Sequence, residues 1–273
     1  MTMNKKIILI CCMLLTPVAT LGQWIGYPSS GVPRLQNGSV DMRAPTPRHV
    51  DGRPDLSGIW ISDNTPVDEP SPSDPYSLPS GRLMTNMGAQ MEGGLPYQEW
   101  LAPIVARHTK NLAIEDPHIR CLPDNFLRAY GLPHLLKFVH KDELLVVLNE
   151  MNAGYRQVFV DGRELPDDPS PSWQGYSSAA WEGDTLVIET IGVRDGTWID
   201  WNGSQIGEKA RIREEITRPD YGHLDIRVTV DDPVAYTRPW SVNLRERIVV
   251  DGELIDEVCL ENERFVEHMN LEY

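Results

Sequence analysis

Residues 179–191 read AAWEGDTLVIETI, and this stretch shows the pattern that decides the fold. Two short runs, 179–181 and 185–191, are rich in apolar and β-branched residues, and Glu182-Gly183-Asp184 separates them. Such runs on either side of a glycine-containing turn are typical of a β-hairpin. The stretch therefore predicts two antiparallel strands, and the same pattern recurs on both sides of it.

The sequence after Arg120 contains a series of such runs, many of them alternating in polarity and divided by turns such as Asp161-Gly162 and Asn202-Gly203. They are residues 135–139, 143–149, 155–160, 179–181, 185–191, 197–201, 210–216, 223–230, 241–250 and 253–260. Strands joined by tight turns form an antiparallel meander, whose edges are removed by closing a barrel or by stacking two sheets. We therefore predict a mostly β protein whose meander closes into a barrel, with a β-sandwich as the alternative.

The sequence before these strands divides into three parts. Residues 1–22 contain two lysines, an unbroken apolar run and then small residues, which is the layout of a secretory signal peptide cleaved after Ala19 or Gly22. Residues 23–94 form an irregular extension rich in proline and serine, with one short strand at 56–61. Residues 95–273 form the barrel domain, which begins with an amphipathic helix over 97–112 because apolar residues recur there at helical spacing.

The signal peptide places the protein in the periplasm or outside the cell, where cysteines become oxidised. Of the four cysteines, Cys11 and Cys12 lie in the signal peptide, so the mature chain keeps Cys121 and Cys259. These two residues form either one disulfide bond or two separate buried thiols, and the oxidising compartment favours the bond.

Charge and motifs exclude several classes of function. The formal net charge of −15 argues against nucleic acid as a partner, and no later stretch is apolar enough to span a membrane. The chain has no nucleophile elbow, no phosphate-binding loop and no cysteine pair at metal-binding spacing. Its seven histidines are scattered, so a zinc site requires three of them to converge from distant segments. We therefore expect no metal and no other cofactor.

Aromatic residues on or beside the short strands are the first candidates for a binding site. Trp173 and Tyr176 precede Trp198 along the chain, and Trp240 follows a later turn. Aromatic side chains lining a cavity, with few polar groups among them, are typical of small-molecule sites. We expect a small apolar or aromatic ligand there, with Arg156 orienting it.

Carboxylates give a rival hypothesis. Glu214 shares a strand face with Ile212 and Ile216, and Glu246 shares one with Leu244 and Ile248. A buried carboxyl group has a raised pKa and can act as a general acid. The alternative function is therefore a cofactor-independent lyase, isomerase or cyclase with Glu214 as acid or base, assisted by Asp200 and Tyr155. The structural interpretation is that Glu214 and Glu246 are paired with arginine side chains. A third alternative is a module that docks another protein of the cell envelope.

Several phrases along the chain resemble a family of uncharacterised exported bacterial proteins. They are 55–60 (DLSGIW), 94–97 (GLPY), 120–123 (RCLP), 155–156 (YR), 161–163 (DGR), 181–187 (WEGDTLV), 231–233 (DDP), 236–240 (YTRPW) and 259–262 (CLEN). Members of that family tend to have a His-Ser pair where this chain has Tyr176-Ser177, so the resemblance does not support catalysis by histidine. Gly58-Ile59-Trp60 is also similar to the entry strand of the lipocalin-like (calycin) barrels, which implies a barrel that binds apolar molecules or converts them.

Overall fold

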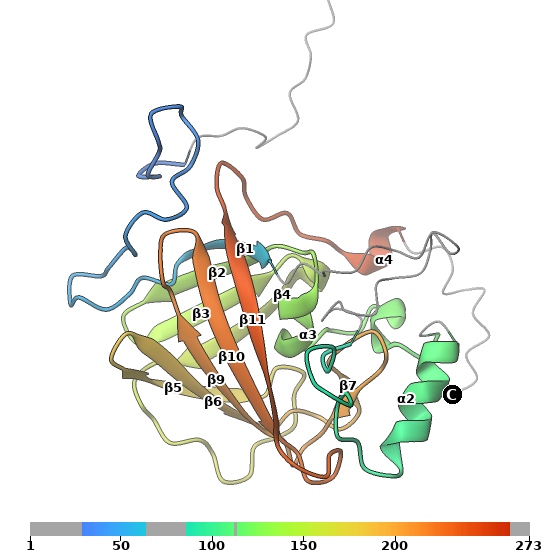
Figure 1. Cartoon of the computed structure of the whole chain (residues 1–273). Coiled ribbons are helices and arrows are strands. Elements are labelled where there is room, and N and C mark those ends of the chain that lie inside the picture. Colours follow the sequence, from blue (N-terminus) through green and yellow to red (C-terminus); the bar gives the residue numbers. More distant parts are fainter. Residues whose placement is uncertain (1–28, 64–85, 112–113, 263–273) are drawn as a thin grey trace, which may run out of the picture.

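The structure is a computed structural model that describes residues 29–63, 86–111 and 114–262. The predicted signal peptide and the start of the extension lie outside these residues. In the described part of the chain, nine strands form a closed barrel in the order β1-β11-β10-β9-β6-β5-β4-β3-β2 (Figure 1). The predicted barrel is therefore confirmed, and the alternative of a β-sandwich is not.

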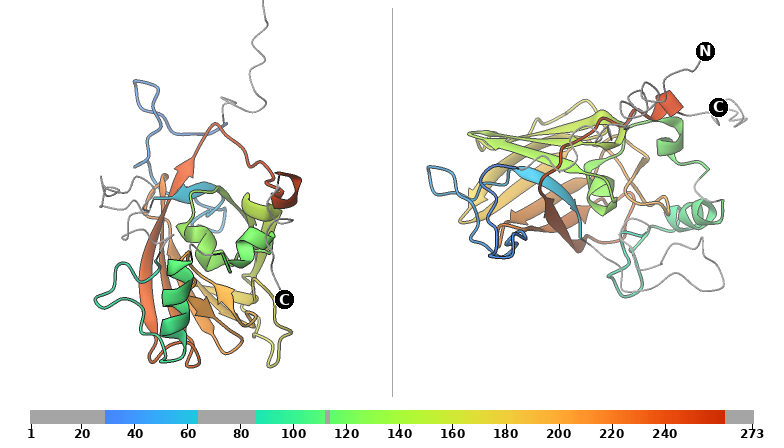
Figure 2. Two further views of the ribbon diagram at one scale, coloured as in Figure 1. Left: turned by 90° about the vertical axis from the view of Figure 1, so that its right-hand side faces the viewer. Right: turned by 90° about the horizontal axis from the view of Figure 1, so that it is seen from above.

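The barrel strands are β1 (Gly58–Ser62), β2 (Leu136–Lys141), β3 (Leu144–Asn149), β4 (Gly154–Phe159), β5 (Tyr176–Glu182), β6 (Thr185–Ile191), β9 (Arg211–Thr217), β10 (His223–Asp231) and β11 (Trp240–Val249). A separate small hairpin pairs β7 (Thr197–Trp198) with β8 (Gln205–Ile206). The helices are α2 (Leu101–Lys110), α3 (Phe126–Gly131) and α4 (Cys259–Asn262), and the 3-10 helices are η1 (Pro117–Arg120) and η2 (Met151–Ala153). Figure 2 shows α2 and α3 on one side of the barrel.

One pair of neighbouring strands departs from the predicted antiparallel order. β4 and β5 run parallel, with only Val158 opposite Ser177 and Phe159 opposite Ser178. The reason is geometric, because a closed ring with an odd number of strands cannot alternate in direction all the way round. The connection from 160 to 175 returns the chain to the end of the barrel at which β4 also begins.

β1 closes the barrel, since it pairs with β11 on one side and with β2 on the other. This strand comes from the irregular N-terminal segment, in which the sequence indicates a strand at 56–61. The residues just before β1 continue onto the barrel: Arg218 donates to the carbonyl oxygens of Asp55 and Ser57, and Thr46 donates to that of Arg218. Residues 44–57 thus lie over the turn end of the barrel, which we define as the end where β2 turns into β3 and β5 into β6.

Alternation along the strands determines which side chains fill the barrel. On β10, Leu224, Ile226, Val228 and Val230 are buried, and intervening residues are more exposed. β9 and β11 alternate in the same way, and each buries one glutamate, as the next section describes. The barrel is therefore a packed core.

Three predicted elements need correction. The helix predicted over 97–112 begins only at Leu101, because residues 97–100 form a turn in which Tyr97 bridges to Tyr236. The strand predicted at 197–201 ends at Trp198, where the small hairpin turns back. The strand predicted at 253–260 is irregular and leads into α4, because β1 and β10 already occupy both edges of β11.

A disulfide bond joins Cys121, at the end of η1, to Cys259, at the start of α4. The predicted bond is therefore present, and the alternative of two free thiols is not. Within the residues that the structure describes, no helix is long and apolar enough to cross a membrane.

Candidate functional site

A cavity of about 620 Å³ lies beside β4 and β5, next to their short parallel pairing. Because only two residue pairs join these strands, the chain segments before the pairing diverge and leave space between them. The cavity is lined by residues 152–157 and 172–177, together with Pro123 and Phe159. Its volume lies within the range of about 300–1,000 Å³ that is usual for small-molecule sites.

This cavity lies at the barrel wall and not in the barrel centre, which side chains fill. On β4, Tyr155 and Gln157 are exposed, whereas Arg156 and Val158 are buried, so the first two point outward. Outward-facing residues form the mouth of the cavity, and Arg156 and Ser177 form part of its inner wall. A ligand therefore has access from solvent without a passage through the barrel.

Four aromatic residues line the cavity, namely Tyr155, Phe159, Trp173 and Tyr176. Tyr155 is 63% exposed and Tyr176 is 40% exposed, whereas Trp173 is half-buried beneath the guanidinium of Arg194, 4.6 Å from its ring centroid. Exposed aromatic side chains gathered at a hollow are a usual mark of a binding surface. The amide of Asn125, just before α3, donates to the carbonyl oxygen of Trp173 at 2.5 Å and so fixes this part of the wall.

All three nitrogens of the Arg156 guanidinium donate hydrogen bonds inside the barrel. It forms a two-point contact with the carboxylate of Glu214, at 2.5 and 3.1 Å. It also donates to the hydroxyl oxygens of Ser177 and Thr190 and lies 3.6 Å above the ring of Phe126. Burial is the largest single influence on the pKa of Arg156 and lowers it, but the interactions with Glu214 and Tyr130 together outweigh burial, so the pKa is raised. Arg156 is therefore a rigid, charged part of the wall whose donors face inward.

Tyr130 of α3 completes this buried network, since its hydroxyl donates to Glu214 at 2.9 Å. Burial, with a further contribution from Glu214, raises the pKa of Tyr130 well above its usual value, so the phenol keeps its proton. A water-sized cavity of about 20 Å³ is lined by Tyr130 and Arg156 among others, and it shares Gly154, Tyr155, Arg156 and Gln174 with the larger one. Arg156 lines both cavities and contacts Glu214, so it connects the buried network to the large cavity.

Glu246 lies on β11 with its carboxyl group inside the barrel and no hydrogen-bond partner among the residues that the structure describes. Burial, with a smaller contribution from Asp63, raises the pKa of Glu246 well above its usual value. The strand pattern predicted the inward face of both Glu214 and Glu246. Glu214 has the arginine partner that the structural interpretation expects, and Glu246 shows none.

The structure brings some of the sequence candidates together and leaves others elsewhere. Tyr155, Arg156, Trp173 and Tyr176 all line the large cavity, and Glu214 contacts its inner wall through Arg156. Asp200, Trp198 and Trp240 do not line it.

Trp198 and Asp200 belong to the small hairpin of β7 and β8, and Trp240 begins β11. Asp200 accepts hydrogen bonds from the backbone N–H of Met87 and from both the N–H and the hydroxyl of Ser204, and burial raises its pKa. Trp198 stacks on His108 with ring centroids 4.5 Å apart, and Trp240 packs edge-on against Tyr236. These contacts organise the loops around β7 and α2.

Sequence reasoning missed Phe126 and Tyr130, because α3 has only six residues and is too short for helical periodicity to show. The signal available was Asn125, a favourable helix-capping residue, directly before Phe126. Comparison with known proteins adds no candidate residues, since no family model, no curated protein and no solved structure shows a significant match to this chain.

Proposed function

We propose that this protein binds a small apolar or aromatic molecule in the 620 Å³ cavity beside β4 and β5. The observation that carries this proposal is the convergence of Tyr155, Trp173 and Tyr176 on one cavity of suitable size. Flat aromatic walls favour a ligand with a planar, apolar part through burial and ring stacking.

The arrangement of Arg156 narrows the chemistry of the ligand. Because Glu214, Ser177 and Thr190 already use its N–H donors, Arg156 has no need of an anionic partner from outside. Pairing it with a ligand carboxylate would break the buried contact with Glu214. A neutral ligand therefore fits this wall better than an anion.

Binding of the neutral fluorescent probe N-phenyl-1-naphthylamine tests the site. Trp173→Ala and Tyr176→Ala should each weaken binding about tenfold, since each removes a large apolar contact. Trp100→Ala is the matched control, because Trp100 is also exposed, at 47%, but does not line the cavity. Equal loss of affinity in the control and in Trp173→Ala would refute the site. Native mass spectrometry of protein isolated from its own host then identifies the natural ligand.

One observation favours catalysis as a second candidate function. Glu214 pairs with Arg156 and accepts a hydrogen bond from the phenol of Tyr130, and both Tyr130 and Arg156 line the water-sized cavity next to the larger one. Glu214 and Tyr130 have the composition of a general base and acid for a lyase, isomerase or cyclase. If the compound found by mass spectrometry is converted, Tyr130→Phe should abolish conversion and retain binding of the probe. Unchanged conversion would exclude this role.

We also propose that the protein is exported and belongs to the family of exported bacterial proteins that its sequence phrases resemble. The Cys121–Cys259 disulfide supports this location, since such bonds persist in oxidising compartments. Mass spectrometry of the protein from a periplasmic or culture fraction should find an N-terminus at residue 20 or 23. A mature protein that begins at Met1 would contradict export through this segment.

A further inference from the structure

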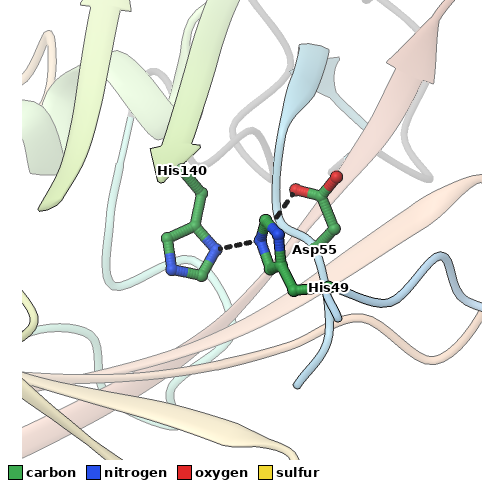
Figure 3. A group of neighbouring side chains, drawn as sticks. All are labelled: His49, Asp55 and His140. Carbon is green, nitrogen blue, oxygen red and sulfur yellow. Dashed lines mark hydrogen bonds and ion pairs between the residues drawn. The ribbon is translucent and has the colours of Figure 1, made fainter. Parts of the chain in front are cut away.

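Two histidines and one aspartate meet at the turn end of the barrel (Figure 3). His140 comes from β2, whereas His49 and Asp55 come from the loop before β1. His49 Nε2 lies 3.1 Å from His140 Nδ1 and 3.3 Å from Asp55 Oδ1, and the three ligand atoms all lie within 4.8 Å of one another.

Protons alone do not satisfy these three atoms well. If His49 Nε2 carries a proton, that one hydrogen faces two acceptors, His140 Nδ1 and the carboxylate of Asp55. If His140 Nδ1 carries it, the lone pair of His49 Nε2 faces the carboxylate at 3.3 Å. A cation placed between the three atoms accepts a lone pair from each of them at once.

The distances also suit a transition metal. Ligand atoms that lie about 2.0–2.1 Å from a tetrahedral zinc ion are about 3.3 Å from one another. The two separations from His49 Nε2, 3.1 and 3.3 Å, differ from this value by a few tenths of an ångström at most. Two imidazoles and one carboxylate are, moreover, a donor set that zinc uses in proteins.

The backbone around the cluster holds the ligands in place. His49 N–H donates to the carbonyl oxygen of Arg53, and Asp55 N–H donates to that of Pro47, so the loop folds back on itself. Ser57 holds both Asp55 and His140. Its N–H donates to Asp55 Oδ1, and its hydroxyl donates to the carbonyl oxygen of His140 and accepts from the N–H of His140. Such outer contacts orient metal ligands before the ion binds.

Exposure differs between the three ligands. His140 is buried, and its ring lies 5.7 Å from that of Trp181, whereas the side chains of His49 and Asp55 are 29% and 30% exposed. One side of the cluster is therefore reached by water. A site with three protein ligands and one position open to water has the composition of a reactive zinc site, whereas purely structural sites supply four ligands.

We propose that His49, Asp55 and His140 form a binding site for one divalent transition-metal ion of the zinc type, with a water molecule at the open coordination position. This site is independent of the proposed ligand cavity, since the two share no residue.

Isothermal titration of the chelator-treated mature protein with Zn²⁺ tests the site. The wild type should bind one ion, and Asp55→Asn and His49→Ala should each weaken binding by at least about tenfold. Asp55→Asn is nearly isosteric and retains an oxygen that can accept from Ser57 N–H, so the fold should survive. Zn²⁺ should also raise the melting temperature of the wild type but not that of these variants.

His223→Ala is the matched control. His223 begins β10 at the same end of the barrel and lies 2.8 Å from Asp220, but that pair contains no second histidine. This variant should bind Zn²⁺ as the wild type does. Absence of Zn²⁺ binding, or equal weakening in His223→Ala and His49→Ala, would overturn the proposal. Mg²⁺ should give no heat of binding, because it prefers an all-oxygen shell.

Discussion

The side chain of Glu246 makes the stability of the barrel depend on pH. Its pKa is raised in the folded protein, so the folded state holds this proton more tightly than the unfolded chain does. The resulting stability is fully present below the unfolded pKa, near 4.5, and falls as the pH rises through the folded pKa. Between the unfolded and the folded pKa, each pH unit lowers the free energy of unfolding by about 1.4 kcal/mol.

We predict that Glu246→Gln stabilises the protein at neutral pH, because glutamine is uncharged at every pH. The melting temperature of the variant should exceed that of the wild type at pH 7.5, and the difference should shrink towards pH 4.5. Differential scanning calorimetry at the two pH values measures it, with Glu164→Gln as a control at an exposed position. A difference that is the same at both pH values would show that the pKa of Glu246 does not change on folding.

Glu214 should have the opposite effect, because it is paired. Removing its charge leaves Arg156 buried without a counter-ion, which costs about 3–5 kcal/mol. Urea unfolding should therefore show a large loss of stability for Glu214→Gln. Glu215→Gln is the matched control on the outer face of β9, where the carboxylate is 34% exposed and contacts Arg213. A loss below about 1 kcal/mol is expected there. Similar losses in both variants would contradict the importance of the buried pair.

For a single residue, the sequence indicates which face of its strand the side chain points to, but not which distant side chain it contacts. Alternation along β9 is enough to turn Glu214 inward, since the pattern is local. Its partners lie 58 residues away on β4 and 84 residues away on α3, and only the closure of the barrel brings them together. The same limit explains why His49 and His140, 91 residues apart, look unrelated along the chain.

The helix α3 connects the buried network to the wall of the ligand cavity. Asn125 caps this helix by accepting from the N–H of Leu127, and its amide donates to the carbonyl oxygen of Trp173. We predict that Asn125→Ala lowers the unfolding free energy by about 2 kcal/mol, because it removes both contacts. Asn125→Ser should cost less, because serine caps a helix but does not reach Trp173.

Denaturant unfolding and binding of the naphthylamine probe separate these two effects. Both variants should bind the probe more weakly than the wild type, since neither holds Trp173. If Asn125→Ser binds as tightly as the wild type, the contact with Trp173 does not shape the cavity.

Strands and helices could be predicted where a run of consecutive residues is long enough to show a pattern. The hairpin of β5 and β6 follows from its runs of apolar and β-branched residues and from the glycine of its turn, Gly183, whose φ is +63°. β8 has two residues and α3 has six, so neither contains enough positions for a period to show. The run 253–260 resembles a strand in composition, but a strand requires a free edge, and the closed barrel offers none.

For the whole molecule, closure depends on β1, the strand most distant in sequence from the others. The sequence favours a barrel because many short strands leave edges to be removed. It does not reveal that the number of barrel strands is odd, and so it does not predict the parallel pairing of β4 with β5. The proposed ligand cavity lies beside this pairing. The sequence therefore indicates individual lining residues, such as Trp173 and Tyr176, but not that they share one cavity.

The disulfide bond is the strongest constraint on the chain as a whole. It joins residues 138 positions apart, and the loop-closure model gives about 4–5 kcal/mol of stabilisation for a loop of this length. Neither cysteine belongs to a barrel strand. The bond should therefore stabilise the barrel by restricting the unfolded chain, without being needed to build the sheet.

We predict that the double variant Cys121→Ser/Cys259→Ser folds to the same barrel but unfolds at a lower urea concentration. A reductant should lower the midpoint of the wild type towards that of the variant and leave the variant unchanged, which is the internal control. Identical midpoints for oxidised wild type and variant would show that the bond adds nothing to global stability. If the loss is as large as loop closure implies, the protein reaches its full stability only where the bond can form, which is in an oxidising compartment.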